Sequence, residues 1–197
     1  NKAEAQIVRE LGKFLIDESL YKGAKPVLWS VVEKTALADA EVEYEDHTSN
    51  TIYVKFLIHK ASDKDLEGAN IVIWTTTPWT IPGNRALAFG SDLKYSLVEV
   101  ENVTEGSLVK VGDKLIFAEE LVSKVSEEIG INSFKNLKNF NGSNLADCLC
   151  EHPFKKLGYD FDVKPFHGDF VNLEQGTGIV HIAPGHGDDD YNLGIKN

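Results

Sequence analysis

Five residues of this chain could act together on one substrate: three consecutive threonines, a histidine and an aspartate. Thr75, Thr76 and Thr77 come where an apolar run that predicts a strand, residues 71–75, meets a turn containing prolines. Side-chain hydroxyls and backbone amides freed at a strand end can hold a water molecule near a carbonyl group, as hydrolysis of an ester requires. Taken alone, the threonines are more simply explained as strand formers with one hydroxyl capping a turn.

His181 and Asp190 belong to a second segment built on the same plan. Glycines flank a predicted strand at residues 178–183, and the following turn leads into a helix start that is rich in aspartate. In an apolar strand, His181 by itself would be a satisfied core histidine. Three aspartates, residues 188–190, are also common at a helix N-terminus, where the helix dipole favours negative charge.

A metal site is the alternative that belongs to a different class of function. His181, His186, Asp188 and Asp190 are acceptable ligand types within ten residues, but the two histidines are separated by a proline and a glycine and cannot share one helix face. The chain contains no HExxH sequence, and the Cys148, Cys150 and His152 group lacks a second pair of ligands. We therefore predict no metal and no cofactor. Motifs for phosphate-binding loops, dinucleotide binding and serine nucleophiles are also missing.

The composition predicts one domain with a substantial core. The chain has 197 residues, 42% of them hydrophobic, and no linker or repeat divides it. We expect a single domain over residues 1–197, with an N-terminal helix and connecting segment at 1–45 and the core at 46–197. With no long apolar run, no signal peptide and two cysteines, it is expected to be a cytoplasmic protein with no membrane partner. The absence of methionine suggests a piece of a larger protein.

Short strands dominate the pattern of the chain. Helices are predicted at residues 3–20, 121–129 and 188–195. Strands are predicted at residues 51–58, 71–75, 85–89, 95–100, 107–111, 115–117 and 178–183. Many strands at this spacing with few helices predict a mostly β (α+β) fold, a closed or nearly closed β-barrel with peripheral helices.

The two segments resemble the editing domain inserted in isoleucyl-tRNA synthetases, which belong to the class I aminoacyl-tRNA synthetases. WTTTPWTIPGNRALAF resembles the threonine-rich motif of that family, and GTGIVHIAPGHGDDDY resembles its second motif, with the histidine and the aspartate nine residues later both in place. KPVLWS, TALADAEVEYED and HPF fit more weakly. In the related valyl and leucyl enzymes an arginine follows the first two threonines and an acidic residue replaces Trp79, so Thr77 and Trp79 favour the isoleucyl type.

The resemblance implies a barrel fold and hydrolysis of valine mischarged to the tRNA for isoleucine, with valyl-adenylate as a further possible substrate. Thr75–Thr77 would position the ester carbonyl and the water. Asp190 would bind the α-ammonium group, since the family motif puts its aspartate there. His181 would bound the side-chain pocket and bond a ribose hydroxyl. Trp79 would contact the terminal adenosine, although ordinary packing explains it equally well.

The implied partners are the 3′ end of tRNA(Ile) and the remainder of the synthetase. The chain lacks the HIGH and KMSKS signatures of the parent's ATP-binding active site, so it should not activate amino acids. Its net charge of −11 predicts weak tRNA binding by the isolated chain, which is expected to be a monomer. A valyl- or leucyl-type editing domain and an inactive tRNA-binding module remain as alternatives.

Overall fold

The computed structural model describes residues 1–24 and 27–197, so Lys25 and Pro26 of the KPVLWS stretch lie outside the described residues. Its contacts divide the chain into two compact units, Asn1–Thr48 and Ser49–Asn197. The boundary lies three residues beyond the predicted one, 48 against 45. A single domain over the whole chain stays a prediction.

The first unit consists of one helix, one small hairpin and one helical turn in its described residues. The helix α1 (Lys2–Ile16) begins where the Asn1 side chain accepts a hydrogen bond from Ala3 N at 3.3 Å. It ends four residues before the predicted end, because Glu18 takes a left-handed φ of 64° and Ser19 N donates to the Asp17 side chain. Two-residue strands and a 3₁₀ turn, all unpredicted, follow: β1 (Trp29–Ser30), β2 (Thr35–Ala36) and η1 (Asp39–Glu41).

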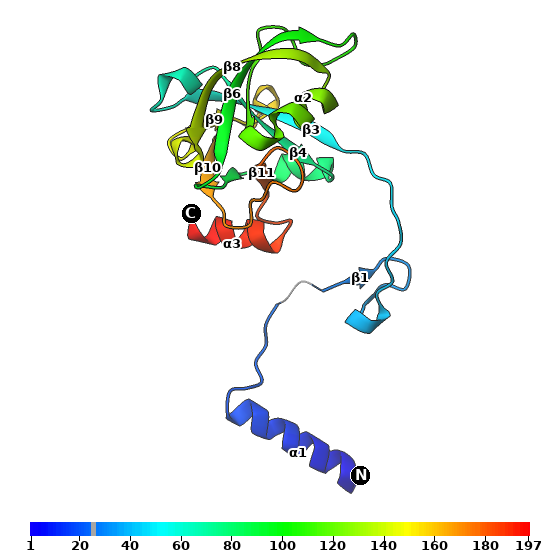
Figure 1. Ribbon diagram of the computed structural model, residues 1–197. Helices are drawn as coiled ribbons and strands as arrows, with labels where there is room; N and C mark the ends of the chain where they lie inside the picture. Colours follow the sequence, from blue (N-terminus) through cyan, green and yellow to red (C-terminus); the bar gives the residue numbers. More distant parts are fainter. Residues whose placement is uncertain (25–26) are drawn as a thin grey trace. The chain divides into compact units, whose positions relative to one another are not determined.

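The second unit is built on one sheet, whose strands run in the order β11-β5-β10-β9-β3-β4-β7-β6-β8 among the described residues (Figure 1). The strands are β3 (Ile52–Lys60), β4 (Asn70–Thr75), β5 (Ala86–Phe89), β6 (Lys94–Val103), β7 (Lys114–Ala118), β8 (Ile131–Asn141), β9 (Leu149–Glu151), β10 (Asp162–His167) and β11 (Ile179–Ile182). Neighbours pair antiparallel except β4 with β7 and β5 with β10, which are parallel. The predicted mostly β fold with helices is therefore confirmed.

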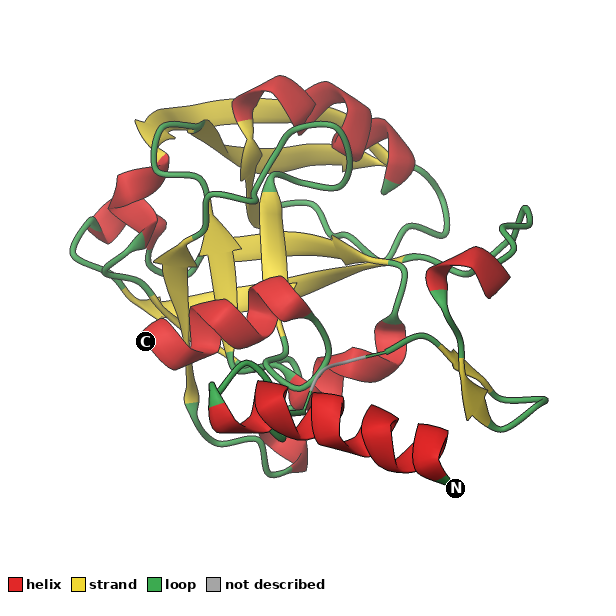
Figure 2. Ribbon diagram, turned by 90° about the horizontal axis from the view of Figure 1, so that it is seen from below, coloured by secondary structure: helices red, strands yellow, loops and turns green. Residues whose placement is uncertain are grey.

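Two α-helices and several 3₁₀ turns cover this sheet (Figure 2). They are α2 (Val122–Glu128), α3 (Asp188–Lys196), η2 (Lys64–Leu66), η3 (Pro78–Gly83), η4 (Glu119–Leu121), η5 (Gly142–Leu145) and η6 (Lys155–Leu157). The main core contains buried side chains of β3, β4, β6 and β7. A smaller cluster packs Leu193 of α3 against Ala86, Ala88 and Ile182 of β5 and β11, which fixes the start of α3 near the end of β11.

The sheet is not a closed barrel, so the predicted closure is wrong. Its end strands, β8 and β11, are not hydrogen-bonded to each other within residues 49–197, although β11 packs against β4. Among the described strands, the long edge strand β8 pairs with β6 alone, and most of its side chains are exposed. β11 has only four residues, and just before it the backbone bonds β7 once, through Ala118 N to Thr177 O at 2.8 Å.

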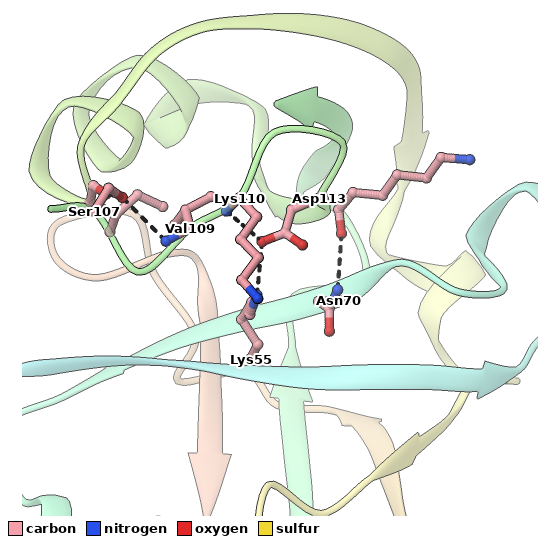
Figure 3. Close-up of polar contacts among 8 residues, drawn as sticks. Lys55, Asn70, Ser107, Val109, Lys110 and Asp113 are labelled. Carbon is pink, nitrogen blue, oxygen red and sulfur yellow. Dashed lines mark hydrogen bonds and ion pairs between the residues drawn. The ribbon is translucent and has the colours of Figure 1, made fainter. Parts of the chain in front are cut away.

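One predicted strand, residues 107–111, is a loop instead (Figure 3). Polar side chains hold it: Asp113 accepts from Lys110 N at 3.0 Å and pairs with Lys55 Nζ of β3 at 2.8 Å. Ser107 Oγ accepts from Val109 N at 3.2 Å in the same loop. These bonds occupy backbone groups that a strand would have used for a ladder. The strands β8, β9 and β10 were missed, β8 because its Asn- and Lys-rich sequence is that of an exposed edge.

Candidate active site

A cleft of about 320 Å³ lies where the end of β4, the turn η3, the strand β11 and the start of α3 meet. Thr75, Thr76, Thr77, His181 and Asp190 all line it. The structure thus brings together five of the six residues singled out in the sequence. The register of the sheet explains this meeting, because β11 lies beside β5 with His181 opposite Leu87, and packs against β4.

The three threonines differ in what their hydroxyls already bond. Thr75 is buried, and its Oγ1 accepts from Thr77 N at 3.1 Å and lies 3.2 Å from Thr77 Oγ1. Thr76 is exposed, and its hydroxyl forms no hydrogen bond within the described part of the chain. The Thr75 hydroxyl therefore shapes the turn, while the Thr76 hydroxyl is free to bond a substrate or a water molecule.

Thr80, which the sequence reasoning missed, connects the threonine turn to the histidine. It is buried on η3, and its Oγ1 donates to Thr77 O at 2.8 Å. The same oxygen lies 3.0 Å from His181 Nε2. Thr80 has a single hydroxyl hydrogen, and Thr77 O can only accept, so we assign that hydrogen to Thr77 O. Thr80 then accepts from His181, which puts the imidazole hydrogen on Nε2. The signal for Thr80 was its place three residues after Thr77, where a helical turn returns to the same face.

His181 is a neutral acceptor at its second nitrogen. It is 8% exposed, and burial lowers its pKa, an effect that the nearby Asp190 carboxylate partly opposes. With the hydrogen on Nε2, its Nδ1 carries a lone pair, and Nδ1 is buried without a hydrogen-bond partner among the described residues. A left-handed glycine sets the strand that holds it: at Gly178, with φ of 75°, a Cβ would lie 2.5 Å from the Ala118 Cβ.

Asp190 is held by the backbone of the turn after β11. Its Oδ1 accepts from Ala183 N at 2.6 Å, while no hydrogen bond within the described chain engages Oδ2. A Cβ at Gly187 would lie 2.7 Å from Asp190 Oδ2, so a side chain there would displace this carboxylate. Asp188 is exposed and is not part of the cleft lining. Of the three aspartates, Asp190 is therefore the one that the fold directs into the cleft.

Trp79 is the predicted site residue that the cleft does not include. Its side chain is 72% exposed on η3, and the tryptophan that lines the cleft is Trp74, half-buried on β4. Gln175 and His186 also line the cleft without having been assigned a binding role. Gln175 lies in a loop with no periodic pattern, so the sequence carried no signal for it. Contact of Trp79 with an adenosine stays a prediction.

The residues considered as metal ligands are not arranged as a metal site, although His181, His186 and Asp190 all line the cleft. Within residues 1–24 and 27–197 there is no group of three or more histidine, cysteine, aspartate or glutamate side chains arranged to hold a metal ion. Cys148 and Cys150 are free and buried, and burial raises the pKa of the Cys148 thiol to about 12, which favours the uncharged thiol. His152 instead bonds backbone groups at both nitrogens. Metal independence itself stays a prediction.

Comparison with solved structures defines the class of fold. The structure is similar to the editing domain of P. knowlesi cytosolic leucyl-tRNA synthetase, with a TM-score of 0.56 and 15% identity over 72% of this chain and 60% of that one. It is also similar to GlLeuRS-CP1, with a TM-score of 0.55 and 14% identity over 73% and 58%. The fold is therefore that of a tRNA synthetase editing domain. Residues 1–174 match the family of class I tRNA synthetases (I, L, M and V), and the chain belongs to that family.

Within the family, the chain is similar to isoleucine–tRNA ligases. It is 54% identical to that of Pelagibacter ubique (strain HTCC1062) over 99% of this chain, and 50% identical to that of Gluconobacter oxydans (strain 621H) over 97%. The chain spans about a fifth of the length of these relatives, 21% and 20% respectively. None of the helices described is long and apolar enough to cross a membrane.

Proposed function

We propose that the second unit hydrolyses the ester that joins valine to the terminal ribose of tRNA(Ile). The observation that carries this proposal is the cleft itself, which combines an unbonded hydroxyl, a histidine and a carboxylate with one free oxygen, on Thr76, His181 and Asp190. The family and the editing-domain fold support it, because they make an aminoacyl-tRNA the appropriate substrate class.

Asp190 supplies the anchor for the amino acid in this proposal. Its Oδ2 accepts from the α-ammonium group, while Oδ1 stays bonded to Ala183 N. A bond between an ammonium and a carboxylate is charge-assisted and stronger than one between neutral groups. The anchor also sets an orientation, since an amino acid held at one end of the cleft places its carbonyl at a fixed distance from the threonines.

Thr76 and the backbone of the threonine turn position the carbonyl and the attacking water. Because the Thr75 hydroxyl is already bonded to Thr77, we assign the substrate contact to Thr76. For His181 to bond a ribose hydroxyl, its buried Nδ1 has to become accessible when the substrate binds. Trp79 contacts the adenosine from outside the cleft. The ribose hydroxyl next to the ester is the proton acceptor that we propose for the water. It takes up a proton from the attacking water and passes its own proton to the leaving ribose oxygen, which ends as a hydroxyl while the valine carboxyl is released. The reaction involves no metal and no covalent enzyme intermediate.

His181 also limits the size of the amino acid. One missing methylene changes binding by about 1–3 kcal/mol, a general range for which isoleucyl-tRNA synthetase is itself the standard example. The synthetic site therefore cannot reject valine by lost contacts alone. A second pocket can reject isoleucine, because an extra methylene in a filled site is costly. The buried imidazole of His181, held in place by Thr80, is rigid enough to form that wall.

At the level of the whole protein, we propose that this unit is the editing domain of a cytoplasmic isoleucine–tRNA ligase. The remainder of that enzyme would bind ATP and supply the tRNA contacts that a chain of net charge −11 lacks. Valyl-adenylate is a second substrate for the same cleft, and the chain acts as a monomer.

The test is the rate at which the chain releases valine from valyl-tRNA(Ile), compared with isoleucyl-, leucyl- and threonyl-tRNAs, with and without a chelator. Faster release of valine than of isoleucine, unchanged by the chelator, is expected. Loss of activity with a chelator and recovery with one metal would identify a metal-dependent hydrolase. Preference for threonyl-tRNA would indicate a valyl-type editing domain, and preference for another amino acid on tRNA(Leu) a leucyl type. Binding of tRNA without any release would indicate an inactive binding module.

A further inference from the structure

His152 is a buried histidine outside the cleft whose two ring nitrogens are both bonded to the backbone. The residue is 2% exposed and follows β9 in the HPF sequence. Its Nε2 lies 3.1 Å from Ile81 O, and its Nδ1 accepts from Phe154 N at 3.0 Å. A carbonyl oxygen only accepts, so Nε2 carries the hydrogen and the ring is neutral, in keeping with a pKa that burial lowers.

Aromatic rings fix the orientation of this imidazole. Tyr159 stacks on it with ring centres 4.6 Å apart and planes 15° apart. Phe56, Phe154 and Phe161 surround it with ring centres between 5.3 and 6.4 Å away. The ring therefore cannot turn without disturbing the packing of four neighbours, and its Nε2–H stays directed at Ile81 O.

The carbonyl that His152 binds belongs to the turn that carries Thr80. Ile81 O also accepts from Asn84 N at 3.0 Å, which closes η3. One residue earlier, Thr80 bonds His181 on the cleft side. The turn is thus hydrogen-bonded to a different histidine on each side: His152 at its rear through Ile81, and His181 in the cleft through Thr80.

We propose that His152 is a positioning residue for the cleft, acting through the backbone of η3. It holds the Ile81 carbonyl, and with it the place of the Thr80 hydroxyl that fixes the tautomer of His181. Without that bond, η3 keeps its own short-range hydrogen bonds, which are weak in a 3₁₀ turn, and the bond from Thr80 to His181 in the cleft. The expected effect of His152 on hydrolysis rests on the proposed function. Its expected effect on the hydrogen bonds of η3 does not.

Two amide substitutions separate the roles of the ring nitrogens. In His152→Gln the amide group reaches the place of Nε2 and can still donate to Ile81 O. In His152→Asn it reaches only the place of Nδ1 and can bond Phe154 N but not Ile81. Both variants lose the ring and its packing. They differ by one methylene and in the bond that they keep, that to Ile81 O in the Gln variant and that to Phe154 N in the Asn variant. Val125→Ala, at a buried position of α2, is the control for a general loss of stability.

Hydrogen exchange of the η3 amides, Thr80 N and Asn84 N, measures the positioning without a substrate. Exchange in His152→Asn should exceed that in His152→Gln by roughly two- to tenfold, the value of one neutral hydrogen bond. Val125→Ala should raise the exchange rates of these amides no more than it raises the exchange rates of amides in the core strands. Equal exchange in the Asn and Gln variants would overturn the proposal. The wild-type imidazole supplies a test that needs no variant: nitrogen NMR should find the hydrogen on Nε2, and a hydrogen on Nδ1 would also overturn it.

Hydrolysis of valyl-tRNA supplies the second readout. We expect kcat to fall in His152→Asn by the same roughly two- to tenfold while His152→Gln stays near wild type, with KM changing less than kcat in both. A fall in kcat that is the same in the two variants would contradict the positioning role. If the wild-type chain releases no valine, the proposed function fails, and the exchange measurements still decide the role of His152.

Discussion

Asp190 performs two tasks with its two carboxylate oxygens, and two substitutions separate them. Oδ1 accepts from Ala183 N at 2.6 Å, and Oδ2 is the oxygen that we assign to the substrate ammonium. Asp190→Asn keeps an oxygen that can accept from Ala183 N but removes the charge. The lost charge-assisted bond is worth about 1.5–3 kcal/mol, which corresponds to roughly 10- to 150-fold slower release of valine. The unfolding midpoint should change little.

Asp190→Ala removes both carboxylate oxygens, and with them the bond to Ala183 N and the proposed site for the ammonium group. The amide of Ala183, a buried residue, then loses its partner, which costs about 1–3 kcal/mol of unfolding free energy in addition to the slower hydrolysis. Asp188→Ala, on the exposed side of the same helix start, is the control and should affect neither. The assays are single-turnover release of valine from valyl-tRNA and urea unfolding. If Asp190→Asn releases valine at the wild-type rate while Asp190→Ala is slow, Asp190 only supports the turn, and our assignment of the ammonium site is refuted.

Three further predictions address the histidines and Thr80. His181→Ala should raise the rate of release from isoleucyl-tRNA relative to that from valyl-tRNA. If the ratio of the two release rates is unchanged, the threonines set the size limit and His181 does not. Thr80→Val should leave His181 Nε2 unpaired, while Thr77 O keeps its bond from the backbone N–H of residue 80, and should cost about 1–3 kcal/mol in urea unfolding. Thr80→Ser should recover most of the stability and the hydrolysis. Burial lowers the pKa of His152 and His181, so below their ordinary value of 6.5 the unfolded chain binds more protons. Stability should therefore be highest above pH 6.5 and fall below it, and a urea midpoint that rises on acidification would contradict this.

The sequence identified the cleft residues where a motif and a strand end coincide. The threonines and His181 lie on apolar runs with clear boundaries, and β4 and β11 form within one residue of the predicted limits at residues 71–75 and 178–183. Thr80 and His152 were not assigned a role because their functions arise from contacts between segments far apart in the chain, 101 residues for Thr80 with His181 and 71 for His152 with Ile81. The local spacing shows that Thr80 shares a face of the turn with Thr77, but it does not show the distant partner of Thr80 or of His152.

The failed closure of the barrel has a similar origin. Strand propensity and turn spacing predict how many strands form, but whether the last strand meets the first depends on edge pairing. Here β8 contains asparagine and lysine at most positions that face solvent, and such an edge favours water over another strand. The strand β8 was not predicted because its sequence is polar, and the same polar sequence is the reason that the sheet stays open.

The charges around the cleft agree with a substrate that is recognised at its amino acid end. Among the residues that line the described cleft there is one carboxylate, that of Asp190, and no lysine or arginine. A site that bound phosphates would need such cations, because phosphate contacts come largely from lysine and arginine. The cleft suits an α-ammonium group and an ester, one positive and the other uncharged. A net charge of −11 then does not oppose the chemistry, because repulsion of the tRNA phosphates concerns parts of the substrate that this cleft does not hold.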